Sequence, residues 1–182
     1  AFQLDYPYGI TSRNNDIYFC DLNNGRLCRL SDGIVTTIIK GLSSPVDVKI
    51  SSTGRIYVAE KGKHRVIEIV KGTAVAVAGT GSAGTGGKDG SAATSFPLNG
   101  PNGIEVDANG DVYIADTGNN RIVKLNVQAQ TIKIISTGGD IAAPYSLATD
   151  DKNILFVSNI INNKILQINL ALIIRKVYLL TI

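Results

Sequence analysis

The segment DVYIADTGNNRIVKL, residues 111–125, places an acid and a base five residues apart across a short turn. Asp116 and Arg121 are separated by the residues Thr-Gly-Asn-Asn. A carboxylate beside a guanidinium can serve in proton transfer, bind an anion or fasten a hairpin by charge-assisted hydrogen bonds. Catalysis needs such a pair once per site, so its frequency along the chain discriminates between these uses.

The same spacing recurs along the chain. The four segments are centred on Asp21, Glu60, Asp116 and Asn159, and the residues five positions later are Arg26, Arg65, Arg121 and Lys164. An aromatic residue stands three positions before each centre: Tyr18, Tyr57, Tyr113 and Phe156. A proline precedes each centre by 14 or 15 positions: Pro7, Pro45, Pro101 and Pro144. A pair that recurs in every unit indicates a repeat architecture, so we predict that these acids and bases fasten turns.

Each repeat has the pattern of four short strands. In the third repeat the strands are expected at PNGIEVD, DVYIAD, RIVKLN and TIKIIST, which Gly and Asn turns separate. Both faces of such a sheet are apolar, so it must be packed between other sheets. The sequence therefore predicts an all-β propeller of four-stranded antiparallel blades. We expect one domain over residues 1–182, with blades at about 5–41, 42–80, 97–138 and 141–182 and a glycine-rich connection at 79–100.

The third repeat, PNGIEVDANGDVYIADTGNNRIVKL, closely resembles the NHL repeat, the blade unit of a β-propeller family. The glycine-rich stretch before it is similar to the connections between blades of many NHL proteins. Propellers of this family usually have six blades. The resemblance therefore implies either a four-bladed ring or an arc of a six-bladed ring that further chain or another molecule completes. The exposed sheet faces of an arc would be apolar patches that need a partner.

Metal and cofactor chemistry finds little support in the sequence. His64 is the only histidine and aligns with the turn residue Asn120, whereas a zinc site needs several nitrogen or sulfur ligands. Among similar propellers, amidating lyases rely on several histidines, and gluconolactonase-like enzymes hold a metal on acidic and amide side chains around the central channel. No uniquely placed carboxylates single out such a channel site in this sequence. We therefore expect no cofactor, while a divalent metal stays an alternative.

Cys20 and Cys28 flank the turn at residues 23–25. Equal parity and a three-residue loop would place the two side chains opposite each other on one face. A cross-strand disulfide and two reduced core thiols are both compatible with this pattern, and the disulfide is favoured. A disulfide would fit an oxidising compartment. We accordingly predict an extracellular or secreted protein, with the cytoplasm as the alternative.

The connection GTGSAGTGGKDG, residues 79–90, has the composition of a phosphate-binding loop without its pattern. A phosphate loop requires Gly-Lys followed by Ser or Thr and then a helix. Lys88 is instead followed by Asp89 and by no helical pattern. We predict a surface connection between blades two and three, in which Lys88 and Asp89 are candidates for recognition.

Charge and hydropathy narrow the functional classes. The net charge is only +3 and the basic residues are scattered, which argues against a strongly electrostatic nucleic-acid binder. The most apolar segment, residues 165–182, is interrupted by Asn169, Arg175 and Lys176, so no membrane span is expected.

The pattern favours a non-catalytic binding or assembly scaffold that belongs to a larger chain or complex and takes a protein partner or a second copy. Two alternatives stay open. One is a metal-dependent lyase or lactonase-like propeller enzyme with a site in its central channel. The other is RNA binding through a basic rim formed by Arg26, Arg65, Arg121 and Lys164.

Overall fold

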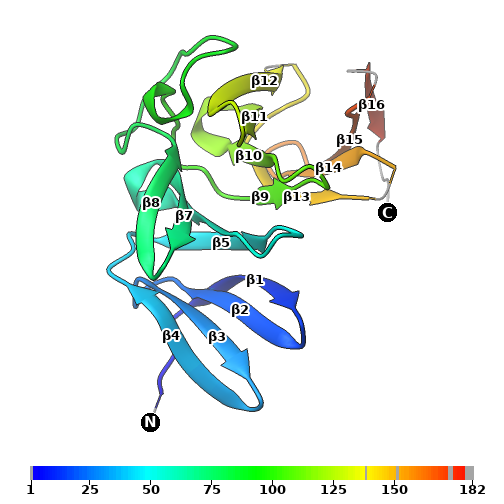
Figure 1. Ribbon diagram of the computed structural model, residues 1–182. Coiled ribbons are helices and arrows are strands. Elements are labelled where there is room, and N and C mark those ends of the chain that lie inside the picture. Colours follow the sequence, from blue (N-terminus) through cyan, green and yellow to red (C-terminus); the bar gives the residue numbers. More distant parts are fainter. Residues whose placement is uncertain (1, 138, 151, 172–173, 179–182) are drawn as a thin grey trace.

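The computed structural model describes residues 2–137, 139–150, 152–171 and 174–178, and these form four antiparallel sheets of four strands each (Figure 1). Blade 1 consists of β1 (Pro7–Arg13), β2 (Asp16–Asp21), β3 (Arg26–Ser31) and β4 (Ile34–Lys40). Blade 2 consists of β5 (Pro45–Ile50), β6 (Ile56–Glu60), β7 (Arg65–Val70) and β8 (Thr73–Ala78). Blade 3 consists of β9 (Ile104–Val106), β10 (Val112–Asp116), β11 (Arg121–Asn126) and β12 (Thr131–Thr137). Blade 4 consists of β13 (Pro144–Thr149), β14 (Ile154–Asn159), β15 (Lys164–Asn169) and β16 (Ile174–Tyr178).

The predicted all-β propeller of four-stranded antiparallel blades is confirmed. In each sheet, strands that are consecutive along the chain are hydrogen-bonded neighbours, which is a simple meander. Three single-turn 3₁₀ helices interrupt the strands: η1 (Lys61–Lys63), η2 (Ala93–Ser95) and η3 (Thr117–Asn119). No helix within the described part of the chain is long and apolar enough to cross a membrane. The last predicted residues of blade 4, 179–182, lie outside the described residues.

The core lies between the blades, because both faces of the inner sheets are apolar. Between blades 1 and 2, Cys20 and Leu27 pack against Val58 and Ile67. The equivalent contacts form the core between blades 2 and 3 and the core between blades 3 and 4. The chain thus buries apolar surface in successive layers around an axis, as expected for a propeller.

The blades fan around an axis at which the first strands of the blades, β1, β5, β9 and β13, converge (Figure 1). Blades 1 and 4 are the two ends of the series and do not pack face to face in the way that successive blades do (Figure 1). Close to the axis the two end blades meet, since the hydroxyl groups of Tyr8 and Tyr145 form a hydrogen bond.

Two glycines permit the close approach of backbones at the axis. A Cβ atom on Gly9 would lie 2.5 Å from the Cα atom of Asp47, and one on Gly103 would lie 2.4 Å from the carbonyl oxygen of Tyr145. Real Cβ atoms do not come this close to a neighbouring backbone. Each glycine therefore allows its strand to cross the first strand of the next blade.

The structure corrects the predicted disulfide. The turn between β2 and β3 contains four residues, 22–25, so Cys20 lies opposite Leu27 and Cys28 lies opposite Phe19. A shift of one residue in register moves a side chain to the other face of a sheet. The two thiols therefore lie on opposite faces, and both are free and buried. Burial raises the pKa of each thiol.

Candidate functional site

The acids and bases of the repeat meet as pairs in blades 1, 2 and 3, and we call each pair a clasp. The arginine Nε lies 2.6 Å from a carboxylate oxygen in all three: Arg26 with Asp21, Arg65 with Glu60, and Arg121 with Asp116. The three acids are fully buried. The two members of a clasp are also cross-strand partners at the ends of the second and third strands. The clasp therefore closes the turn that joins these strands.

The second oxygen of each acid performs another repeated task. It accepts a hydrogen bond from a backbone amide two residues before the proline of the same blade. The donors and acceptors are Asp5 to Asp21, Ser43 to Glu60, Asn99 to Asp116 and Ala142 to Asn159, at 2.7–2.8 Å. The side chain thus ties the turn after the second strand to the segment that leads into the first strand. In the three acids, both carboxylate oxygens therefore accept hydrogen bonds that fasten the blade.

The clasp of blade 3 also holds the glycine-rich connection. Arg121 donates hydrogen bonds to the carbonyl oxygens of Gly86 and Pro97, and its guanidinium lies 4.5 Å from the ring centroid of buried Phe96. Asn119 donates to the carbonyl oxygen of Gly84 at 2.9 Å. This explains why Arg121 is only 6% exposed. The non-repeating connection is therefore fixed to the most regular repeat.

The pKa values of two clasp acids, Asp116 and Asp21, shift in opposite directions. Burial raises the pKa of Asp116, against the hydrogen bonds from Asn99, Asn119 and Arg121 that stabilise its charged form. Burial also acts to raise the pKa of Asp21, but the hydrogen bonds that it accepts outweigh this effect and hold its pKa below the ordinary value. An Asp–Arg clasp therefore has an acid of raised pKa in blade 3 and an acid of lowered pKa in blade 1.

Blade 4 departs from the clasp pattern. Asn159 accepts a hydrogen bond from the amide of Ala142 and donates to the side chain of Asn162, which keeps the amide-binding half of the clasp. Lys164 instead lies 3.7 Å from a carboxylate oxygen of Asp140, whose side chain is 56% exposed. Asn159 and Lys164 are cross-strand neighbours, but the ion-pair partner of Lys164 is Asp140. Lys164 therefore contacts an exposed acid, whereas the arginines of blades 1 to 3 contact buried acids.

His64 and Asn120 occupy equivalent left-handed turn positions, as the alignment predicted. Each accepts a hydrogen bond from a backbone amide just before the proline of the next blade. Gly100 donates to Nδ1 of His64 at 2.9 Å, and Ala143 donates to Oδ1 of Asn120 at 2.8 Å. The single histidine is thus part of the connection between blades 2 and 3.

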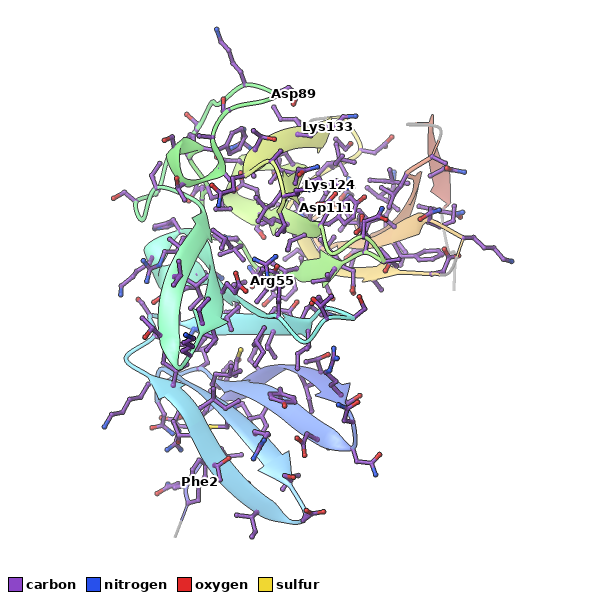
Figure 2. All side chains as sticks on the ribbon, viewed as in Figure 1. Phe2, Arg55, Asp89, Asp111, Lys124 and Lys133 are labelled. Atoms are coloured by element: carbon purple, nitrogen blue, oxygen red, sulfur yellow. The ribbon has the colours of Figure 1, made fainter. Side chains whose placement is uncertain are left out.

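The predicted recognition residues, Lys88 and Asp89, are both exposed, and Figure 2 shows Asp89 at the outer end of the glycine-rich connection. The Asp89 carboxylate accepts a hydrogen bond from the amide of Ile134 at 2.6 Å, and Gly90 donates to the carbonyl oxygen of Ile132 at 2.8 Å. Asp89 therefore anchors the connection to β12. Lys88 leaves its ammonium group available at the surface.

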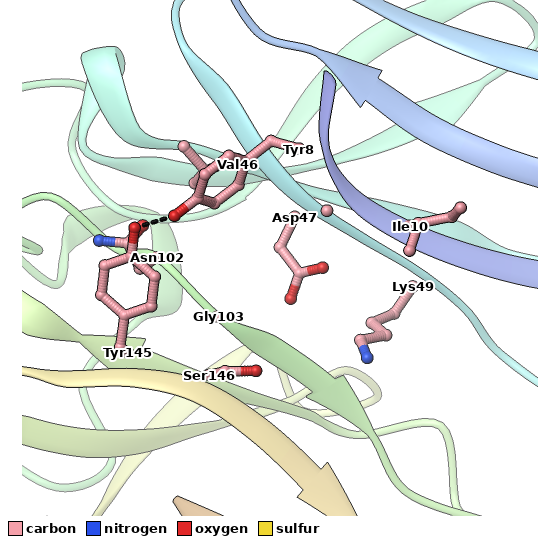
Figure 3. A pocket seen from close by; sticks show the side chains of 10 residues that line it. Tyr8, Ile10, Val46, Asp47, Lys49, Asn102, Gly103, Tyr145 and Ser146 are labelled. Carbon is pink, nitrogen blue, oxygen red and sulfur yellow. Dashed lines mark hydrogen bonds between the residues drawn. The ribbon is translucent and has the colours of Figure 1, made fainter. Parts of the chain in front are cut away.

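A pocket of about 340 Å³ opens at the axis between the first strands of the blades (Figure 3). We call it the axial pocket. Its polar and aromatic lining residues are Tyr8, Asp47, Lys49, Asn102, Tyr145 and Ser146. The rings of Tyr8 and Tyr145 meet edge to face with centroids 6.5 Å apart. The pocket therefore combines aromatic surface with a few converging polar groups, as ligand sites commonly do.

Asp47 is the central charged group of this pocket. Its two carboxylate oxygens accept hydrogen bonds from the amides of Val48 and Ile104, each at 2.9 Å. Burial raises its pKa to about 6, against the opposing effects of Lys49 and of these amides. Lys49 in turn lies 3.2 Å from a carboxylate oxygen of Glu105. Because that pair is neutral as a whole, Asp47 supplies the net negative charge.

Asn102 adds an unused acceptor. Its side-chain oxygen is buried and has no hydrogen-bond partner, and the residue is 3% exposed. A buried polar atom without a partner is uncommon and indicates a place for a missing donor. Figure 3 shows the Asn102 amide beside the Tyr8–Tyr145 contact. A ligand that donates a hydrogen bond would satisfy this oxygen.

The donors of the axial pocket do not fit a catalytic metal. One carboxylate and one amide oxygen face it, and the Lys49 ammonium lies beside them. Within the described ranges, no group of three or more His, Cys, Asp or Glu side chains could hold an ion. Divalent cations prefer several anionic or carbonyl oxygens. The chemistry that this pocket supports is hydrogen bonding and charge recognition.

The expectation that no uniquely placed carboxylate lies at the central channel is wrong, because Asp47 lines the axial pocket. It stands two positions after the registered proline, where the other repeats carry Gly9, Gly103 and Ser146. The sequence signal was a departure from the repeat on a strand that leads to the axis. An alignment of repeats emphasises the positions that recur, so it does not point to this one.

Comparison with known proteins agrees with this architecture. Residues 98–125 match the family described as the NHL repeat. The chain is therefore a β-propeller that contains an NHL repeat. A curated relative from Arabidopsis thaliana, the chloroplastic protein SUPPRESSOR OF QUENCHING 1, is 32% identical over 100 residues. That match covers 53% of this NHL-repeat chain and 9% of the Arabidopsis protein.

Solved structures of other propellers share the fold. A virginiamycin B lyase from Staphylococcus aureus, solved as a catalytically inactive histidine-to-alanine variant with quinupristin, is 20% identical, with a TM-score of 0.69. A gluconolactonase from Xanthomonas campestris is 16% identical, with a TM-score of 0.73. The matches cover 91% and 92% of this chain but only 53% and 59% of those proteins. The chain thus spans little more than half their length, and the likeness concerns the fold.

Proposed function

We propose that the NHL-repeat chain is a non-catalytic binding and assembly scaffold that works as part of a larger chain or complex. The observation that carries this proposal is that the three repeated acids, and Asn159 in the fourth blade, all form hydrogen bonds that fasten their own blades. Catalysis would require an acid or base that is free to exchange protons with a substrate. The repeated residues are instead committed to structure.

The axial pocket is the recognition site in this proposal. It offers a negative charge at Asp47, an acceptor without a partner at Asn102 and two aromatic rings. These groups suit a small polar ligand, or the side chain of a partner protein, that donates hydrogen bonds. None of these four pocket residues belongs to a clasp.

A screen of small polar compounds that reads the shift in melting temperature tests this recognition directly. We expect compounds with hydrogen-bond donors to stabilise the chain, and we expect Asn102→Ala to remove their effect. Asn109→Ala, at an exposed turn, is the matched control and should preserve the response. Stabilisation that persists in Asn102→Ala would contradict recognition at the axial pocket.

The enzyme alternative rests on the likeness to the lyase and the gluconolactonase and on Asp47 with its raised pKa. The inactive variant of the Staphylococcus enzyme indicates that this lyase depends on a histidine. In the present chain, Nδ1 of His64 is occupied by the amide of Gly100. Metal analysis distinguishes the alternatives: the scaffold proposal expects no stoichiometric divalent ion, whereas one tightly held ion per chain that Asp47→Ala removes would support the enzyme.

RNA binding finds less support, because the bases that would form a cationic rim are paired. Each of the three clasp arginines contacts a buried carboxylate, and Lys164 faces Asp140. A steep loss of RNA affinity with rising salt concentration would restore this alternative.

Location is a separate part of the proposal. We propose that the chain is extracellular or secreted, and the cytoplasm is the alternative. Fractionation of cells that produce a tagged copy would test this directly.

A further inference from the structure

Blade 3 contains a fully hydrogen-bonded polar cluster beside the turn between its first two strands. The Nζ atom of Lys124 lies 3.1 Å from a carboxylate oxygen of Asp107 and 2.9 Å from one of Asp111. The Tyr113 hydroxyl donates to the same Asp107 oxygen at 3.4 Å. The other Asp107 oxygen accepts hydrogen bonds from the amides of Asn109 and Asp111. Asp107 therefore fastens the turn with one oxygen and binds a base and a phenol with the other.

Blade 2 has the same turn, with Ser51 in the place of Asp107. The amide of Ser51 donates to the carbonyl oxygen of Arg55 at 2.9 Å, as the amide of Asp107 does to that of Asp111 at 3.0 Å. The Ser51 hydroxyl also accepts a hydrogen bond from the Arg55 amide at 3.1 Å. Ser51 thus performs the turn role of the first Asp107 oxygen. A serine has no counterpart of the second oxygen.

Tyr57 occupies the position of Tyr113, and its hydroxyl shows the consequence of this difference. The hydroxyl oxygen is buried and has no hydrogen-bond partner among the described residues, and Tyr57 is 0% exposed. Burial raises the pKa of Tyr57 to about 12, so the phenol keeps its proton and can donate it. A buried donor without an acceptor is costly and uncommon. Blade 2 therefore buries a hydroxyl whose equivalent in blade 3 is bound by a carboxylate.

Arg55 supplies further donors beside this hydroxyl. Its Nε atom and one of its Nη atoms donate to the two carboxylate oxygens of Glu68 at 2.7 and 2.6 Å. The guanidinium carbon of Arg55 lies 5.4 Å from the ring centroid of Tyr57, and the Arg55 side chain is 42% exposed. A guanidinium carries more N–H donors than one carboxylate can accept. Arg55 can therefore hold a second anion while it stays paired with Glu68.

Two pockets adjoin Arg55 at the boundary between blades 2 and 3. The larger, of about 740 Å³, is lined by Ser51, Arg55 and Asp111, which come from the two facing blades (Figure 2). The smaller, of about 210 Å³, is lined by Arg55 and Glu68 among others. Neither shares a lining residue with the axial pocket. The larger pocket also presents hydroxyl and amide side chains, from Ser52, Thr53, Asn109, Asn126 and Gln128.

We propose that Ser51, Arg55, Tyr57 and Glu68 form a second recognition site, the Arg55 site, which binds a small polar carboxylic acid in its ionised form. The carboxylate of the ligand takes the role that Asp107 has in blade 3: it accepts a hydrogen bond from the Tyr57 hydroxyl and pairs with Arg55. The hydroxyl and amide groups of the larger pocket bind the remainder of the ligand. Because Tyr57 is fully buried, the anion reaches its hydroxyl when the half-exposed Arg55 side chain rotates.

The charges around the Arg55 site are compatible with one added carboxylate. Blade 3 places the two acids Asp107 and Asp111 around the single base Lys124. With a ligand bound, blade 2 has the same composition, since Glu68 and the ligand surround the single base Arg55. Asp111 faces the larger pocket from blade 3, but Lys124 neutralises it at 2.9 Å. The ligand therefore restores in blade 2 an arrangement that blade 3 already contains.

Tyrosine absorption reports the binding of an anion at this site. The chain has seven tyrosines and no tryptophan, so its near-ultraviolet spectrum follows tyrosine hydroxyls. The probes are acetate and malonate, with acetamide as the uncharged control and sodium chloride at matched ionic strength. We expect a saturable red shift with acetate and malonate alone, because the Tyr57 hydroxyl gains an anionic acceptor. The absence of a saturable shift, or an equal shift with acetamide, would overturn the inference.

Tyr57→Phe removes the hydroxyl alone and keeps the ring. We expect it to weaken the binding of acetate at least about tenfold, since hydrogen bonds to charged groups are strong, as measured by NMR titration of the backbone amides. Tyr113→Phe is the matched control, because Tyr113 has the equivalent position in blade 3 and already has Asp107 as its acceptor. This control should bind acetate as the unaltered chain does. Equal affinities of Tyr57→Phe and the unaltered chain would overturn the role of the hydroxyl.

Ser51→Asp supplies the missing carboxylate from within the chain. Asp107 and Asp150 hold the equivalent positions of blades 3 and 4, so aspartate suits this turn. We expect Ser51→Asp to raise the melting temperature and to abolish the spectral response to acetate and malonate. A full response in this variant would place the anion elsewhere and overturn the inference. Because the Arg55 site and the axial pocket share no residue, such a failure leaves recognition at the axial pocket standing.

Discussion

The clasps and the axial pocket are built from the same repeat, yet they follow opposite rules. At the clasps the repeat varies little: blades 1, 2 and 3 use an acid and an arginine with the same 2.6 Å contact. At the axis, the position two residues after the proline holds Gly9, Asp47, Gly103 and Ser146. The recurring pair fastens each blade, whereas at the variable position only Asp47 places a charged side chain in the axial pocket.

Two buried side chains, Asp116 at a clasp and Asn102 at the axis, differ in how their oxygens are hydrogen-bonded. Asp116 uses both carboxylate oxygens in three side-chain and backbone hydrogen bonds within its own blade. Asn102 buries an oxygen at the axis that has no partner. Complete pairing stabilises a fold, whereas an unused buried acceptor is tolerated where a ligand or partner supplies the donor. The following predictions set one region against the other.

The largest effect is expected at the clasp of blade 3. Asp116→Ala removes the acid and leaves Arg121 as an unpaired charge that is 6% exposed. We expect a loss of about 3–5 kcal/mol in the free energy of unfolding, because breaking a buried ion pair strands the other charge. Urea denaturation provides the measurement. A loss below about 1 kcal/mol would be the value of an exposed ion pair and would contradict the structural role.

Much of this clasp could be predicted from the sequence. The recurrence of Asp116 and Arg121 assigned the pair to the turn, and the propeller fold followed from the same repeats. Its links to the connection were not predictable, because Gly86 and Pro97 offer backbone carbonyls that carry no sequence signal. The disulfide prediction failed on a turn of four residues instead of three, which changes the face of every following side chain.

The axial pocket was less accessible to prediction for a physical reason. Asp47 and Asn102 belong to different repeats and meet only because the first strands of the blades converge at the axis. No spacing along the chain reports this distance. The signal that was present is the departure of Asp47 from the small residues at its register position.

The pH dependence of stability should reveal Asp47. Its folded pKa of about 6 lies above the unfolded value near 3.8, so the native state binds more protons in this window. The contribution of Asp47 therefore decreases as the pH rises from about 4 to about 7, by about 1–3 kcal/mol. Asp47→Asn removes this titration. The stability of the unaltered chain relative to Asp47→Asn should fall across the window, and a constant difference would contradict the raised pKa.

Asp21 provides the contrasting titration at a clasp. Its folded pKa is lowered, so its contribution is present above the unfolded pKa and is lost as the pH falls through the folded value. Asp21→Asn should therefore approach the stability of the unaltered chain at acidic pH. A gap between the two that widens on acidification would contradict the lowered pKa.

Gly103 gives a smaller effect, on packing at the axis. Gly103→Ala would place a methyl group 2.4 Å from the carbonyl oxygen of Tyr145 and should cost about 1–3 kcal/mol, as overpacking usually does. Ser146→Ala changes an exposed residue at the equivalent position of blade 4 and should cost little. Equal melting temperatures for the two variants would show that the axial strands are less closely packed than described.

The smallest effect is expected where the clasp pattern breaks down. Lys164→Ala removes a contact of 3.7 Å to an exposed carboxylate and should change the free energy of unfolding by about 0–1 kcal/mol. Added salt should reduce even this difference. A loss comparable to that of Asp116→Ala would show that blade 4 retains a buried clasp.

The central claim, that the recurring acid–base pair fastens the fold, is tested most directly by a double-mutant cycle. Asp116→Ala, Arg121→Ala and the double variant would be compared with the unaltered chain by the free energy of unfolding in urea. We predict a coupling energy of about 2–3 kcal/mol between the two side chains, because each single change strands the other residue in a buried place. A coupling energy below about 0.5 kcal/mol, with both single variants near the stability of the unaltered chain, would contradict the account.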